Sequence, residues 1–107
     1  MTIKNLTDHP IVILNSDNKR IMYLHPEGEP ARVKKIVEQV DYLGAIPLSE
    51  ARFGKIKNLP PPSPNVIYIV SKMVFEAAKD RYDLYYPAEK VRDNKGRVLG
   101  CKSLGLS

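Results

Sequence analysis

The sequence lacks the patterns that mark secreted and membrane-embedded proteins. Its one cysteine cannot form an intramolecular disulfide, so we expect a reducing compartment. No apolar run approaches the roughly 18 residues of a bilayer-spanning helix. The N-terminal segment MTIKNLTDH also lacks the apolar centre of a signal peptide. These absences predict a cytoplasmic protein without membrane contact.

Motifs for metal binding and nucleophilic catalysis are also missing. His9, His25 and Cys101 are far apart and show no paired ligand spacing. In the C-terminal segment GRVLGCKSLGLS, Gly96 and Gly100 are too close together for a phosphate-binding P-loop. A free cysteine is more often a packed residue than a nucleophile, although the sequence leaves the reactivity of Cys101 open. We therefore expect no metal, no cofactor and no catalytic residue, and an enzyme is the less favoured class.

Positive charge exceeds negative charge in a chain of 107 residues. The 17 Lys and Arg against 12 Asp and Glu give a net charge of +5 and a pI near 9.4, which favours acidic partners such as nucleotides or nucleic acid. The cations are dispersed, with Lys34–Lys35 and Lys55/Lys57 the closest to clusters, so long nucleic acid is the less favoured partner. The length and the 43% hydrophobic share predict one folded domain, residues 1–107.

Several β-branched, alternating segments predict short strands. Residues 11–14 and 20–25 form a predicted hairpin around the turn NSDNK, and residues 90–104 form a second one with DNKG at its tip. The proline-rich stretch at 58–65 predicts a stiff spacer loop.

The segment 31–44 fits two structures. Four apolar side chains follow the spacing of one helix face: Val33, Ile36, Val37 and Val40. Its β-branched content and the following AIPLSEARFGKI favour instead two strands around a turn near Gly44. Periodicity alone predicts the helix.

A strand-helix-strand unit is predicted over residues 66–86. VIYIV and YDLYY are its strands, the second ended by Pro87, and the helix covers about 71–81 with Ser71 as N-cap. Whether the two strands are parallel is left open. The expected fold class is α+β, a small β-rich domain of hairpins with one β-α-β unit.

The start of this helix is the best candidate for binding an anion. Ser71 and Lys72 would present backbone N–H groups there, and Tyr86 would emerge at the same sheet edge if the strands are parallel. An ordinary capped helix with solvated charges is the alternative. Other predicted ligand-binding residues supply charge or polar contacts: Thr7, His9, Arg92, Arg97 and Lys102.

Four motifs together resemble a family of small uncharacterised proteins encoded by phages, prophages and bacteria. They are NLTDHPIVIL, ARV, FGKIKNLPPPSPNVIYIVSKMV and VRDNKGRVLGCKSL, and in order they span nearly the whole chain. The chain departs from the family pattern at Asp8, where proline is usual, and at Lys102, where arginine is usual; lysine loses the bidentate fork toward phosphate. The resemblance implies no established activity, but it implies that residues 31–57 are mainly strand.

These features predict a phage-associated, non-enzymatic protein of the host cytoplasm. It would bind and sequester a small anionic, nucleotide-like ligand, and as a small chain it would form a homo-oligomer. The alternative is a structural or host-factor-interaction module, such as a virion accessory or inhibitor, without a small-molecule ligand.

Overall fold

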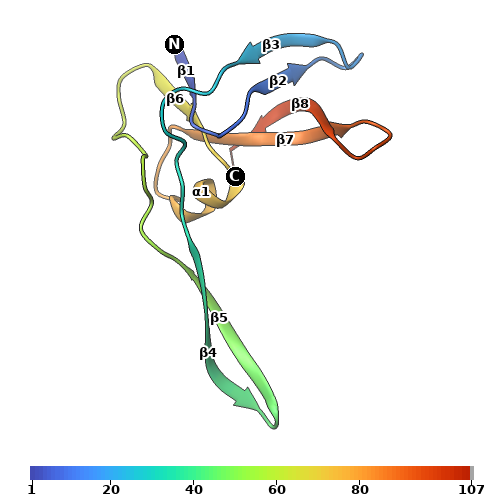
Figure 1. Ribbon diagram of the computed structural model, residues 1–107. Coiled ribbons are helices and arrows are strands. Elements are labelled where there is room, and N and C mark those ends of the chain that lie inside the picture. The colour runs from blue at the N-terminus through green and yellow to red at the C-terminus, as the bar shows by residue number, and fades with distance from the viewer. Residues whose placement is uncertain (107) are drawn as a thin grey trace.

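The computed structural model describes residues 1–106 as a curled sheet from which a hairpin projects (Figure 1). The main sheet has six strands in the order β1-β6-β7-β8-β2-β3, and β4 and β5 form a separate two-stranded sheet. The elements are β1 (Thr2–Asn5), β2 (Ile11–Leu14), β3 (Arg20–Leu24), β4 (Lys35–Leu43), β5 (Ile46–Phe53), β6 (Val66–Ile69), α1 (Lys72–Ala77), β7 (Leu84–Arg92) and β8 (Val98–Gly105). The predicted α+β class is confirmed.

The β-α-β unit is present, and its two strands are parallel. Tyr68 of β6 pairs with Leu84 of β7, and Ile69 pairs with Tyr85. Strand β1, which the sequence did not predict, adds to the other side of β6, also in parallel. Parallel neighbours on both sides bury β6, which accounts for its apolar sequence VIYI.

Helix α1 begins as predicted but ends earlier. The Ser71 side chain accepts a hydrogen bond from the Val74 N–H at 3.2 Å, so its predicted N-cap role is confirmed. The predicted end near residue 81 is wrong, because the helix stops at Ala77 and Ala78 leaves the helical conformation. Arg81 and Asp83 then pair with each other in the connection to β7, which replaces further helical turns.

Pro87 does not end a strand, contrary to the prediction from YDLYY. Strand β7 continues through it to Arg92 and pairs with β8, with Pro87 opposite Leu104. Because β6 ends at Ile69, opposite Tyr85, Pro87 has a neighbouring strand on one side only. A residue without an N–H is tolerated at such a position.

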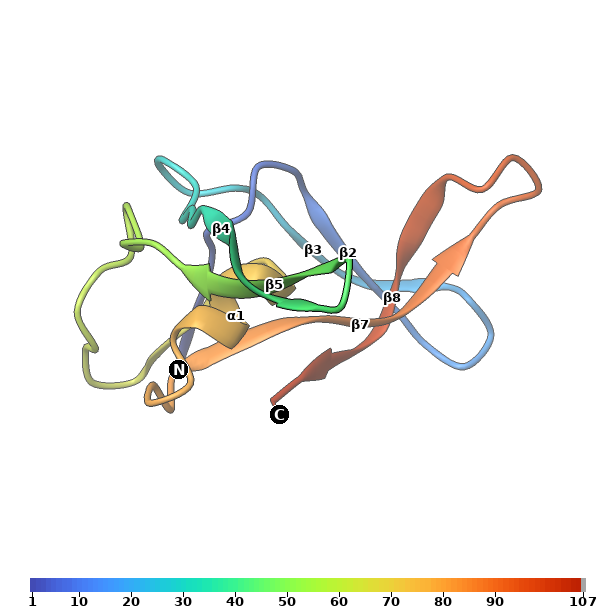
Figure 2. The ribbon, with the colours of Figure 1, turned by 90° about the horizontal axis from the view of Figure 1, so that it is seen from below.

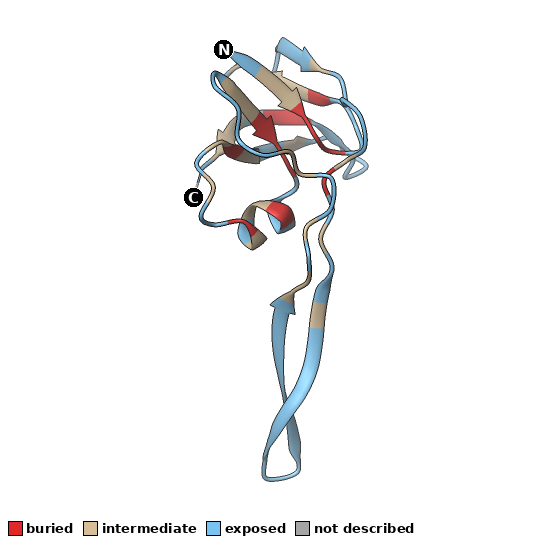
Figure 3. Cartoon of the chain, turned by 90° about the vertical axis from the view of Figure 1, so that its left-hand side faces the viewer, coloured by how far each residue is buried: buried red, intermediate tan, exposed pale blue. Residues whose placement is uncertain are grey.

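The segment 31–57 is mainly strand, as the resemblance implied, and the helix predicted by periodicity is wrong. Strands β4 and β5 pair from Lys35–Phe53 at one end to Leu43–Ile46 at the turn. In the turn, Gly44 has a φ of +61°, whereas the φ of Ala45 is not positive. This combination fits a type II′ hairpin turn. Residues 35–53 are called the arm below. It points away from the main sheet, and almost all of its side chains are exposed (Figure 3).

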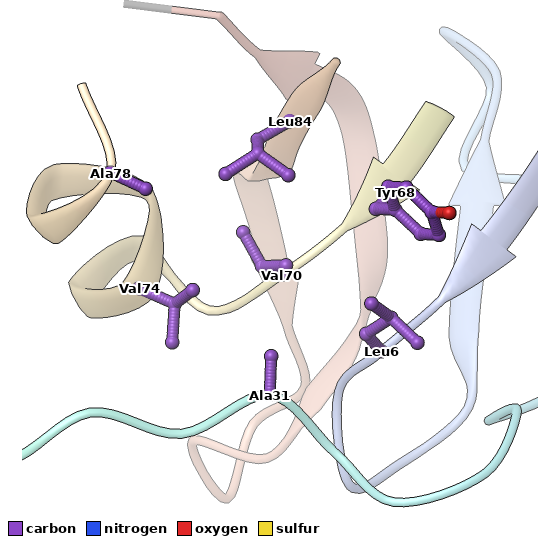
Figure 4. Close-up of a cluster of buried hydrophobic side chains, with 7 residues drawn as sticks. All are labelled: Leu6, Ala31, Tyr68, Val70, Val74, Ala78 and Leu84. Carbon is purple, nitrogen blue, oxygen red and sulfur yellow. The ribbon is translucent and has the colours of Figure 1, made fainter. Parts of the chain in front are cut away.

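Two hydrophobic clusters lie on opposite faces of the main sheet. The larger joins the sheet to α1 through seven buried side chains: Leu6, Ala31, Tyr68, Val70, Val74, Ala78 and Leu84 (Figure 4). On the other face, Ile69 packs with Ile11 and Cys101. Successive β6 side chains point to alternate faces, so this one strand contributes to both clusters. The β2–β3 and β7–β8 turns project from the end of the sheet opposite the proline-rich loop (Figures 1 and 2).

Candidate anion-binding cleft

A cleft of about 1110 Å³ lies where the base of the arm meets the start of α1 and the middle of β7. The loop after β1 and the segment 30–34 complete its wall. Its apolar lining consists largely of Ala31, Val33, Ile36, Met73, Pro87 and Ala88. The volume lies just above the range of small-molecule sites, which measure roughly 300–1,000 Å³.

Positive charge dominates the wall of this cleft. Six cationic side chains line it: Arg32, Lys34, Lys55, Lys57, Lys72 and Lys90. Against them stand two carboxylates, Asp8 and Glu89, so the lining carries a net charge of +4 with His9 neutral. The whole chain carries a net charge of +5, so the residues that line the cleft account for most of this excess. Such concentration raises the local density of anions, and the apolar wall strengthens the effect by excluding water.

Asp8 reduces the charge at one end of the cleft only. Its carboxylate lies 3.0 Å from His9 Nδ1 and 3.9 Å from the Arg32 guanidinium. The hydrogen bond from His9, and more weakly the charge of Arg32, hold the pKa of Asp8 below its ordinary value. None of the five lysines in the lining forms an ion pair with a side chain of residues 1–106. They remain available for a ligand.

Five of the eight residues predicted to bind ligand line the cleft: Thr7, His9, Ser71, Lys72 and Tyr86. Thr7 is buried, and its hydroxyl lies 2.6 Å from Asn5 Oδ1 and 2.9 Å from the His9 carbonyl oxygen. It therefore holds the loop after β1 in shape. Helix α1 has only six residues, and one of its first N–H groups is taken by Ser71, so attraction of an anion rests on the lysines and not on the helix end.

Tyr86 is already packed within the fold. Its ring lies 4.8 Å from that of Phe75, centroid to centroid, and the Lys72 ammonium lies 5.7 Å from its centre. A Cβ added at Gly105 would come within 2.2 Å of the ring, so the Tyr86 side chain requires glycine there. Stacking of a ligand base on Tyr86 stays a prediction, restricted to the part of the ring that faces the cleft.

The other three predicted residues, Arg92, Arg97 and Lys102, do not line the cleft. Arg92 donates a hydrogen bond to the Gly96 carbonyl at 2.8 Å, and Arg97 pairs with Asp93 at 2.8 Å, so both are held within the β7–β8 turn. Because β7 runs on to Arg92, it carries this turn away from the start of α1 (Figure 2).

Four of the six cations of the cleft lie at the base of the arm and were not predicted as site residues: Arg32, Lys34, Lys55 and Lys57. Arg32 and Lys57 pair backbone to backbone, which brings the two ends of the arm together and their charges with them. The lysine pairs at 34–35 and 55/57 were the sequence signal. These pairs indicate one cationic site only because the segment 31–57 folds back on itself and brings them together.

Cys101 is expected to be unreactive in the folded protein. It is 3% exposed on β8, and burial raises the pKa of its thiol, which lowers the thiolate fraction at neutral pH. We expect a disulfide reagent such as 5,5′-dithiobis(2-nitrobenzoate) to label it about 100-fold more slowly in buffer than in denaturant, since labelling requires opening of the fold. Equal rates in the two conditions would contradict the buried position.

Comparisons with family profiles, with curated proteins and with solved structures find no match to this chain. Within residues 1–106, no helix is long and apolar enough to cross a membrane. The same residues contain no group of three or more His, Cys, Asp or Glu side chains placed to hold a metal ion.

Proposed function

We propose that this protein binds a small anionic, nucleotide-like ligand in the basic cleft without catalysing a reaction on it. The observation that carries the proposal is the net charge of +4 around an apolar cavity of about 1110 Å³. A nucleotide combines both matching parts: a phosphate group for the lysines and a flat, largely apolar base for the inner wall. The resemblance to phage-encoded proteins adds the biological setting, sequestration of a host nucleotide in the host cytoplasm.

The cationic side chains divide the cleft into two regions. Lys34, Lys55 and Lys57 lie at the base of the arm, while Lys72 and Lys90 lie on α1 and β7. A phosphate between these two groups would be attracted from both sides. Lysines act here as mobile point charges, which suits ligands whose phosphate groups differ in number and position.

The test is thermal unfolding of the protein with a panel of nucleoside mono-, di- and triphosphates, cyclic nucleotides and inorganic phosphate. We expect at least one phosphorylated compound to raise the melting temperature. In the variant Lys34→Glu/Lys55→Glu, the affinity for that compound should fall by about tenfold or more, equivalent to about 1.4 kcal/mol.

The matched control is Lys79→Glu/Lys95→Glu, which changes the net charge equally but lies outside the cleft. It should bind like the wild type apart from a small long-range effect that salt removes. If no phosphorylated compound stabilises the protein, or if both variants lose affinity equally, the proposal is wrong.

The alternative function, an interaction module, is supported by a different observation. The arm exposes apolar side chains far from the cleft, among them Tyr42 and Leu43, which are 59% and 65% exposed. Such a surface is typical of protein-protein contact. The two functions are compatible, because they use separate parts of the chain.

A further inference from the structure

The arm carries an apolar surface that the rest of the described chain, residues 1–106, leaves uncovered. Its members are 40–65% exposed: Val37, Val40, Tyr42, Leu43, Ile46 and Leu48. A two-stranded hairpin on its own is marginally stable in water, and three or more strands are needed for independent stability. Within residues 1–106, no other strand pairs with β4 or β5. The arm therefore has the properties of a segment that is completed by a partner.

A second incomplete surface lies at the edge of the main sheet. Strand β3 is the last strand in the order, and three consecutive side chains, Ile21, Met22 and Tyr23, are 63%, 44% and 38% exposed. Consecutive residues point to opposite faces, so both faces of this strand are open. An edge of this kind presents unpaired backbone N–H and C=O groups to any strand that approaches, here up to Leu24, whose carbonyl oxygen accepts from Asn5.

The two surfaces carry opposite charge. The arm has Glu38, Asp41 and Glu50 against Lys35 and Arg52, a net charge of −1 in a chain of +5. Strand β3 begins at Arg20, and Lys19 directly precedes it. Pairing two arms would set acidic stretch against acidic stretch, whereas pairing an arm with β3 brings opposite charges together.

One edge of the arm is better suited to pairing than the other. Strand β4 has nine residues and no proline, whereas Pro47 removes a backbone donor from β5. Strand β3 also contains no proline. No backbone donor is therefore missing along either strand, and each strand has one irregularity in its present pairing, at Val40 of β4 and at Ile21 of β3.

The arrangement of the chain directs this contact to a second molecule. Figure 1 shows β3 and the arm at opposite ends of the protein, whose longest dimension is 53 Å, so an arm cannot reach the β3 of its own chain. Two copies placed side by side in opposite directions bring each arm along the body of the other. This arrangement is closed by a two-fold axis and uses each surface once per chain.

We propose that the protein forms a two-fold dimer in which β4 of each arm adds to the β3 edge of the other copy. The contact is β-strand addition between two edges that both expose backbone groups and apolar side chains. It does not depend on a ligand in the cleft, since no residue of β3 lines the cleft and only Ile36, near the start of β4, does so on the other strand.

The test is the mass of the assembly by native mass spectrometry and light scattering. The wild type should have twice the chain mass of 12.1 kDa. An arm variant, Leu43→Lys/Ile46→Lys, and an edge variant, Ile21→Glu/Met22→Glu, should each be monomeric. The control Val98→Glu/Leu99→Glu replaces two apolar side chains of similar exposure on β8 and should stay dimeric. Far-UV circular dichroism checks folding, and single variants Leu43→Lys and Ile21→Glu replace any double variant that unfolds.

Mixing the two monomeric variants separates this dimer from other arrangements. The mixture contains one intact arm and one intact edge, so a heterodimer with a single pairing should form, at least about tenfold weaker than the wild-type dimer. A monomeric wild type, a mass larger than two chains, or a mixture that stays monomeric overturns the proposal. An edge variant that dimerises like the wild type also overturns it, in favour of arm-to-arm pairing, and loss of dimer in the control shows a contact elsewhere.

Discussion

Replacing Asn5 by alanine is expected to lower the free energy of unfolding by about 2–4 kcal/mol. Asn5 is 1% exposed at the end of β1, and its side chain is fully hydrogen-bonded. The amide nitrogen donates to the His9 and Leu24 carbonyl oxygens at 2.9 and 3.0 Å, and Oδ1 accepts from the Thr7 N–H at 2.9 Å. The alanine variant leaves these groups without partners in a site closed to water.

The loss is expected to be large because Asn5 connects two strands and does not only stabilise its own loop. Strands β1 and β3 are the two edges of the six-stranded sheet, and Asn5 joins the end of one to the end of the other through Leu24. The backbone reinforces the same closure, because the Glu27 N–H donates to the Asn5 carbonyl at 2.8 Å. Asn5 therefore holds the sheet in its curled form.

The measurement is urea unfolding of the wild type, Asn5→Ala and the control Asn15→Ala. Asn15 also uses its side-chain oxygen to accept two backbone N–H groups, of Asp17 and Lys19, but in an exposed turn where water replaces them. The control should lose less than about 1 kcal/mol. Asn5→Asp should lower the free energy of unfolding as much as Asn5→Ala. The aspartate keeps the oxygen that accepts from the Thr7 N–H, but it places its second oxygen against the carbonyl oxygens of His9 and Leu24. Equal losses of unfolding free energy at Asn5 and Asn15 would show that burial of the Asn5 hydrogen bonds adds nothing to stability.

Local sequence patterns predicted the parts of the fold that depend on neighbouring residues. The hairpin of β2 and β3 follows from two β-branched runs around NSDNK, and the N-cap follows from Ser71 before an apolar helix face. Local patterns did not decide the structure of segment 31–44, because its apolar residues have the spacing of a helix face and the β-branched composition of a strand. Pairing of β4 with β5 decides between them, and that is a contact between segments.

The candidate site was predicted only in part for the same physical reason. Ser71, Lys72 and Tyr86 lie on consecutive elements of one β-α-β unit, so their proximity follows once the strands are parallel. Lys55 and Lys57 join them through the return of the chain after β5, which no local pattern encodes. Arg92 and Arg97 were misplaced because β7 passes through Pro87 and carries their turn away.

The second large effect is expected at the ion pair of Arg81 and Asp83, where Arg81→Ala should cost about 2–4 kcal/mol. The guanidinium donates to both carboxylate oxygens at 2.8 Å and to the Pro60 carbonyl oxygen at 2.9 Å. The two side chains are only 17% and 14% exposed, so removing arginine leaves a carboxylate with little access to water. The control is Arg97→Ala at the pair with Asp93, where the arginine is 72% exposed and the loss should stay below about 1 kcal/mol.

This ion pair also makes stability depend on pH in a defined direction. The hydrogen bonds from Arg81 hold the pKa of Asp83 below its ordinary value. Between the folded and unfolded pKa values the unfolded chain therefore binds more protons, so stability rises with pH there. The contribution is complete above about pH 5 and disappears as the pH falls through the folded pKa.

Substituting both partners by apolar residues, Arg81→Met/Asp83→Leu, should remove part of this acid sensitivity while costing less stability at pH 7 than Arg81→Ala. Urea unfolding of both variants between pH 3 and pH 7 measures the two effects, and an unchanged pH slope in the double variant would exclude Asp83 as a source of the acid sensitivity.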